Sequence, residues 1–224
     1  GSEPVPAGEE IRRVVPVLEA IRRESEVLLS VDTRKPEVAE AALEAGADIL
    51  NDISALRADR SAGGGGGASA GGMAALAARR EAPLILMHMR GEPKTMQVQP
   101  YYRDVVSEVL AELAEAVAFA TSAGLQRLIV DPGIGFGKRL EDNLCLLKNL
   151  AVLRGLGCPV LVGLSRKSFL GAVSGAAVEA RLAATIAGNT LAILGGADIV
   201  RVHDVREAVE AARLVQAVQG AGCR

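Results

Sequence analysis

The chain has 224 residues, a length typical of one domain with a full hydrophobic core. Its 25 lysines and arginines nearly balance 27 aspartates and glutamates, and this near-neutral charge argues against a nucleic-acid-coating surface or a polybasic membrane anchor. Half of the residues are hydrophobic but only 2% are aromatic, which disfavours an aromatic platform for single-stranded nucleic acid.

Short apolar segments alternate with longer amphipathic segments along the chain. In chain order, the predicted strands are residues 27–31, 47–50, 83–87, 127–130, 159–164 and 197–202. The predicted helices are residues 9–23, 35–45, 73–80, 101–123, 142–156, 177–194 and 205–218. Strands that are apolar throughout, rather than alternating, are typical of a parallel sheet covered on both faces. The alternation therefore predicts an α/β fold with a parallel sheet, in a single domain spanning residues 1–224.

A polar or ionisable side chain follows almost every predicted strand. These side chains are Asp32, Asn51, Asp52, His88, Asp131, Ser165, Arg166, Lys167, Arg201 and His203. A (β/α)8 barrel brings all its carboxyl strand ends to one mouth, whereas a doubly wound sheet gathers only the ends beside its switch point. The pattern therefore favours the barrel. Because six strands are two short of the eight in a closed barrel, we expect either that an N-terminal part is missing from this chain or that the barrel is not closed.

Two glycine-rich segments need separate interpretation. Residues 61–72 (SAGGGGGASAGG) are of low complexity and are predicted to form a flexible loop with no chemistry of their own. Residues 131–138 (DPGIGFGK) resemble a phosphate-binding loop but lack the required spacing, since Pro132 replaces the first glycine of that motif and Arg139 its final Ser or Thr. We expect this second segment to pass close to a ligand instead.

The polar residues at the expected mouth suit a particular kind of ligand. Asp32 and Asp131 can accept paired N–H groups from a flat heterocycle, and the Asn51 amide can both donate and accept. Arg201 and His203 lie two residues apart on one strand and therefore face the same way, as an anion clamp would. These residues predict a ligand that joins a guanine-like ring to a phosphate group.

Each of these residues also has an ordinary structural interpretation. The sequence leaves these alternatives open: Asp32 as a helix cap, Asp131 as an Asx-turn residue, His88 as a packed histidine, Lys167 as a solvated lysine, Phe136 as a packed loop residue, and Arg201 and His203 as partners of Asp198 or Asp204.

Five sequence blocks occur in an order and at spacings that resemble dihydropteroate synthase, an enzyme family of the folate pathway. The blocks are VDTRKPEVAEAALEAGADILNDI, LMHMRGEPKTMQ, DPGIGFGK, GLSRKSFLG and RVHDV. The resemblance extends over residues 8–215 and implies the (β/α)8 barrel of that family. The chain lacks the family's first two strand blocks, which are the two strands that the barrel count lacked.

The resemblance implies a transferase that joins dihydropterin pyrophosphate to p-aminobenzoate, releasing pyrophosphate, with roles for ten residues. Asp32, Asn51, Asp131 and Lys167 would hold the pterin, with Met87 on its apolar wall and Gly163 also in contact with substrate. Arg201 and His203 would hold the pyrophosphate. Phe136, Ser165 and the stem of Lys167 would border p-aminobenzoate, where sulfonamide inhibitors would compete. The catalytic residues would be Asp131, Lys167, Arg201 and His203.

Further expectations concern cofactor, partners and location. Mg²⁺ is expected with the substrate pyrophosphate, its protein ligand lying in the missing N-terminal part. The resemblance implies a homodimer, and the sequence predicts no nucleic-acid or membrane partner. The three cysteines, Cys145, Cys158 and Cys223, lack metal-ligand spacing and are typical of reduced thiols in a cytoplasmic protein. Two alternatives stay open: a methyltetrahydrofolate-dependent methyltransferase and a non-catalytic pterin-binding paralogue.

Overall fold

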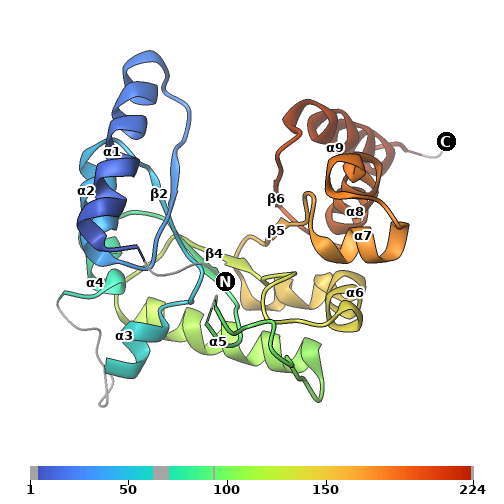
Figure 1. The fold of residues 1–224 in the computed structure, drawn as a ribbon, viewed down its shortest axis with the longest axis horizontal. Helices are drawn as coiled ribbons and strands as arrows, with labels where there is room; N and C mark the ends of the chain where they lie inside the picture. The colour runs from blue at the N-terminus through green and yellow to red at the C-terminus, as the bar shows by residue number, and fades with distance from the viewer. Residues whose placement is uncertain (1–4, 63–70, 93, 223–224) are drawn as a thin grey trace. The chain divides into compact units, whose positions relative to one another are not determined.

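The computed structural model describes residues 5–62, 71–92 and 94–222. The chain divides into two compact units, each described by itself below (Figure 1). The first unit consists of Gly1–Met89 and Ala111–Val130, and the second of Arg90–Leu110 and Asp131–Arg224. Within the described residues, no helix combines the length and apolar character needed to cross a membrane.

The first unit is built on a four-stranded sheet. Its strands, in the spatial order β1-β2-β3-β4, are Ser30–Asp32, Ile49–Asp52, Leu84–Met87 and Leu128–Asp131. The pairs β1–β2 and β2–β3 are parallel. The helices along this stretch of chain are α1 (Ala7–Glu24), α2 (Pro36–Glu44), α3 (Arg57–Ala62), α4 (Met73–Arg79) and α5 (Val105–Ser122), whose first turns belong to the second unit.

Apolar strand residues form the core of the first unit. Leu50, Leu84 and Leu86 are fully buried at the centre of the sheet. Helix α2 packs against α1 and buries Val38 and Ala39, residues that follow the proline at its first position. Strand β3 is buried at all four of its residues, which explains why it is apolar throughout.

The second unit contains two paired strands and most of the C-terminal helices. Strands β5 (Leu161–Gly163) and β6 (Ile199–Arg201) are parallel, with Val162 opposite Val200. The helices are α6 (Leu140–Lys148), α7 (Ser168–Ser174), α8 (Leu182–Leu194) and α9 (Val205–Gln219), with 3-10 turns at Leu150–Leu156 and Val178–Ala180. Helix α8 packs against α7, α9 and β6, so this unit keeps the alternation of strand and helix.

The six predicted strands are confirmed, but their boundaries differ from the prediction. Strands β1, β2 and β4 end on polar residues that the sequence placed beyond them, Asp32, Asp52 and Asp131. Strand β6 ends at Arg201, one residue before its predicted end. The sequence missed α3 and α7, and the predicted helix 142–156 is interrupted at Asn149. The flexible loop predicted at residues 61–72 is wrong at Ser61 and Ala62, which lie in α3, while residues 63–70 fall outside the described part of the chain.

Candidate functional site

The candidate residues fall into two sets, one in each unit. In the first unit, the parallel register sets Asp32 of β1 opposite Asn51 of β2, and Met87 ends the next strand, β3. Asp32 is exposed, while Asn51 and Met87 are buried. The Asn51 Oδ1 atom has no hydrogen-bond partner among the described residues. A buried acceptor without a partner is costly, and a ligand N–H group would satisfy it.

The loop that follows Asp32 is held by helix α1. The Thr33 hydroxyl donates to Glu10 Oε1 over 2.7 Å, and the Lys35 ammonium pairs with Glu10 Oε2. Burial alone would raise the pKa of Glu10, but the hydrogen bonds from Lys35 and Thr33 outweigh it and lower that pKa. Lys35, at the N-cap of α2, makes no side-chain capping bond. The sequence did not identify Glu10, because its partners lie more than twenty residues away.

Two polar residues beside this set have internal partners. The buried Asp52 carboxylate accepts hydrogen bonds from the backbone N–H groups of Ser54 and Leu56, both over 2.8 Å, and so turns the chain towards α3. His88 is buried after β3, with its Nε2 atom 3.1 Å from Glu112 Oε2. These contacts favour a structural role for both residues, as the sequence interpretation of His88 allowed.

Asp131 lies at the centre of the second set, and both of its carboxylate oxygens are engaged. Oδ1 accepts the backbone N–H of Gly133 over 2.8 Å, and Oδ2 accepts from Arg201 over 2.9 Å. Asp131 is buried, whereas 43% of the Arg201 side chain is exposed, so the guanidinium can still meet a ligand. Asp131 therefore forms both the turn contact that the sequence allowed and an ion pair with a cation.

The alternative partners suggested for Arg201 are wrong. Asp204 pairs with Arg166 over 2.7 Å, and Asp198 accepts the backbone N–H of Val160 over 2.8 Å. The sequence could not show that Arg201 pairs with Asp131, which lies 70 residues earlier.

Lys167 is not a solvated surface lysine. Its ammonium donates to the carbonyl oxygen of Ile134 and lies 4.7 Å from the centre of the Phe136 ring. Burial, which disfavours the charged form, lowers the pKa of Lys167 from 10.5 to about 8; the nearby Asp131 charge opposes this shift and the Arg201 charge adds to it. Phe136 is half-buried, with Lys167 over its ring.

Ser165 and His203 connect the ends of β5 and β6. The Ser165 hydroxyl oxygen lies 2.9 Å from His203 Nδ1 and accepts the backbone N–H of His203 over 3.2 Å. Gly163 is opposite Arg201 in the β5–β6 register. Ser165 is buried and His203 is exposed. The second unit therefore brings together a carboxylate, a guanidinium, an ammonium and an imidazole at the carboxyl ends of its strands.

Parallel strands that carry ionisable groups at their carboxyl ends define a class of α/β enzymes whose sites lie on that side of the sheet. The comparison with known families makes this class specific. Residues 1–203 match the family described as pterin binding enzyme, and the chain belongs to this family.

Several similar proteins are dihydropteroate synthases. The Escherichia coli enzyme is 43% identical over 223 residues, which cover 99% of this chain and 75% of that enzyme. A solved structure of the Xanthomonas albilineans synthase in complex with 7,8-dihydropteroate has a TM-score of 0.86 at 42% identity, covering 99% of this chain and 78% of the other. The Yersinia pestis synthase in a sulfonamide drug complex has a TM-score of 0.88 at 38% identity, covering 97% and 76%. These relatives confirm the predicted α/β barrel class.

Proposed function

We infer that this chain is a dihydropteroate synthase, a transferase of folate biosynthesis. It condenses 6-hydroxymethyl-7,8-dihydropterin pyrophosphate with p-aminobenzoate to give 7,8-dihydropteroate and pyrophosphate. The observation that carries this conclusion is the 43% identity to a curated synthase over nearly the whole chain. The cluster of Asp131, Lys167 and Arg201 supplies the charges that such a reaction needs.

Pterin contacts are proposed for each set separately. In the first unit, Asp32 and Asn51 are proposed to exchange hydrogen bonds with the pterin ring and Met87 to pack against it. In the second unit, Asp131 is proposed to accept pterin N–H groups. The unpartnered and buried Oδ1 of Asn51 supports this role, because a pterin N–H group would satisfy it. Lys167 donates to the same ring in its charged form, while Gly163 lets substrate approach the backbone of β5.

Arg201 and His203 are proposed to hold the pyrophosphate. As the bond from the pterin methylene carbon to the pyrophosphate oxygen breaks, its electron pair leaves with the pyrophosphate. The amine nitrogen of p-aminobenzoate then forms a bond to that carbon and loses one proton to solvent. Arg201, oriented by Asp131, stabilises the negative charge that develops on the leaving group. This chemistry requires no nucleophile from the protein.

Phe136, Ser165 and the stem of Lys167 are proposed to border p-aminobenzoate. Their support is proximity, since the Lys167 ammonium lies over the Phe136 ring and Ser165 is two residues from Lys167 in the chain. The sulfonamide complex of the Yersinia pestis relative makes the same drugs expected competitors here.

Mg²⁺ is proposed to arrive with the pyrophosphate. The described residues hold no group of three or more His, Cys, Asp or Glu side chains that could bind a metal ion, and Arg201, proposed for the pyrophosphate end, is a cation. These residues do not fit a protein-bound Mg²⁺, and no step above passes through one.

We also propose a cytoplasmic homodimer. Five large apolar side chains on helices α8 and α9 are more than half exposed, which supports an interface between two copies. They are Leu191 and Leu194 of α8 and Val205, Leu214 and Val218 of α9.

Calorimetric binding separates this function from the methyltransferase alternative. The synthase is expected to bind dihydropterin pyrophosphate in the presence of Mg²⁺. It is expected to bind methyltetrahydrofolate weakly, because that ligand carries no pyrophosphate on its pterin methylene carbon for Arg201 and His203 to bind. Substituting Arg201→Ala should lower the affinity for dihydropterin pyrophosphate on the order of tenfold or more. Arg206→Ala, at an exposed position, is the matched control. Preference for methyltetrahydrofolate would contradict the assignment.

A further inference from the structure

Lys138 is a buried lysine that has no role in the proposed reaction. Only 3% of the residue is exposed, and the sequence interpretation of residues 131–138 gave it no role. Its ammonium donates to the carbonyl oxygens of Gly133 and Phe136, over 2.9 and 3.1 Å, and lies 6.0 Å from the centre of the Tyr102 ring. A buried charge requires such partners, and these partners close the 133–136 turn from inside.

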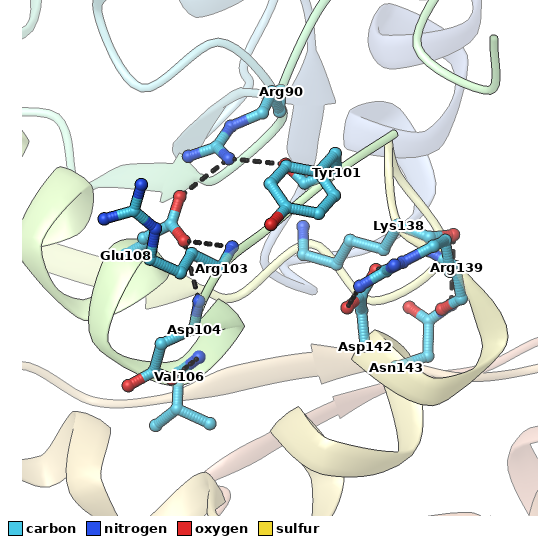
Figure 2. Close-up of polar contacts among 10 residues, drawn as sticks. All are labelled: Arg90, Tyr101, Arg103, Asp104, Val106, Glu108, Lys138, Arg139, Asp142 and Asn143. Carbon is cyan, nitrogen blue, oxygen red and sulfur yellow. Dashed lines mark hydrogen bonds and ion pairs between the residues drawn. The ribbon is translucent and has the colours of Figure 1, made fainter. Parts of the chain in front are cut away.

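Further hydrogen bonds hold the same turn. Figure 2 shows Lys138 together with Arg139, Asp142 and Asn143, the residues at the start of α6. Asn143 of α6 accepts the backbone N–H of Gly135 over 2.6 Å and donates to the carbonyl oxygen of Arg139 over 2.8 Å. Gln97, from the segment before α5, donates to the carbonyl oxygen of Gly135 over 2.8 Å. Side chains from several parts of the second unit therefore hold the turn, and the Lys138 ammonium binds two of its carbonyl oxygens.

The closed turn covers Lys167. The carbonyl oxygen of Ile134 accepts from the Lys167 ammonium, and the Phe136 ring lies beneath it. A methyl group added at Gly135 would lie 3.0 Å from Lys167 Cδ, so the turn packs closely on the lysine stem. The turn thus supplies both a hydrogen-bond acceptor and a cover that excludes water from Lys167.

We propose that Lys138 is a positioning residue that keeps the 133–136 turn closed over Lys167. This inference deepens the proposed function, because Lys167 is one of the residues proposed to hold the pterin. Lys138 itself touches neither substrate nor reacting atoms in this account. It acts through the carbonyl oxygens that it holds.

The proposal has a consequence that a merely structural lysine would not have. Burial has the largest effect on the pKa of Lys167 and lowers it to about 8. The Asp131 charge opposes this shift, and the Arg201 charge adds to it. Opening the turn admits water and removes the Ile134 acceptor. Because burial is the larger influence, the net change is a rise in the pKa of Lys167 towards its ordinary value.

The experiment is competitive acetylation of the intact chain with trace acetic anhydride across a pH series, with Lys167 followed by peptide mass spectrometry. Lys138→Met removes the ammonium and keeps the side-chain length, and should raise the Lys167 midpoint by about one pH unit or more. Lys138→Arg keeps a charged donor and should give a smaller rise. Lys148→Met, at an exposed position of α6, is the matched control and should leave the midpoint unchanged.

An unchanged or lowered midpoint in folded Lys138→Met would overturn the proposal. If that variant does not fold, Asn143→Ala tests the same turn from its other side, and a midpoint that does not rise there overturns the proposal as well. Since acetylation needs no substrate, this result is independent of synthase activity. A wild-type chain that labels as expected but makes no dihydropteroate would refute the proposed function alone.

Discussion

The buried carboxylate of Asp131 accepts hydrogen bonds from two partners, one on each oxygen. Its Oδ1 shapes the turn at Gly133, and its Oδ2 orients Arg201. Substitution Asp131→Asn keeps the shape but removes the charge that holds Arg201. We expect kcat to fall on the order of 10²-fold, since a misdirected guanidinium no longer stabilises the leaving pyrophosphate.

Steady-state kinetics of purified Asp131→Asn tests this expectation, with circular dichroism to confirm folding. Glu141→Gln, an exposed carboxylate on α6, is the control and should keep wild-type turnover. Wild-type kcat in Asp131→Asn would show that the ion pair does not contribute to catalysis.

Gly137 is restricted by both its backbone and its neighbours. Its φ is +59°, and an added Cβ would lie 2.3 Å from the carbonyl oxygen of Arg90. Gly175 has a similar φ of +72° with no atom near its missing Cβ, which makes it a matched control. Gly175→Ala should cost about 1 kcal/mol for the backbone alone, and Gly137→Ala about 3 kcal/mol or more. Urea unfolding measures both, and equal losses would mean that the Arg90 contact relaxes without cost.

The sequence identified the candidate residues better than it identified the side chains that contact them. The motifs singled out Asp131, Lys167 and Arg201, because charged residues after apolar strands stand out in any reading of the chain. The burial of Lys138 and the pairing of Arg201 with Asp131 depend on contacts between distant parts of the chain, and periodicity carries no information about them.

Elements were predictable where an apolar run or an amphipathic period was long. The strands begin one to three residues later than predicted, because apolar residues such as Val27 and Leu28 remain exposed before β1. Helices α3 and α7 have only six and seven residues, too few for a clear period. Local hydrophobicity predicts that an element exists, while its ends depend on tertiary contacts.

The contact between α1 and the loop after β1 gives a pH prediction. The lowered pKa of Glu10 means that its ion pair with Lys35 stabilises the fold above the ordinary glutamate pKa of 4.5, and that this contribution is lost as the pH falls through the lowered value. Glu10→Gln should lose about 0.5–1 kcal/mol at neutral pH. Urea unfolding at neutral and at strongly acidic pH tests this. A deficit that persists undiminished in acid would contradict the ionic explanation.

At the scale of the whole molecule, the order of strands and motifs carried most of the functional information. Each predicted strand is present, and the five sequence blocks place the candidate residues at or near strand ends in both units. The single domain predicted for residues 1–224 stays a prediction beside the two compact units. The polar residues at the strand ends predicted a barrel class although only six strands were counted, and relatives that align with nearly all of this chain confirmed it.

The most direct test of the central claim is pyrophosphate release from dihydropterin pyrophosphate with Mg²⁺, measured with and without p-aminobenzoate. A dihydropteroate synthase couples departure of pyrophosphate to attack by the arylamine, so release should depend on p-aminobenzoate and match dihydropteroate formed one for one. A sulfonamide should suppress the coupled release. Failure of p-aminobenzoate to increase release or yield dihydropteroate would contradict the account.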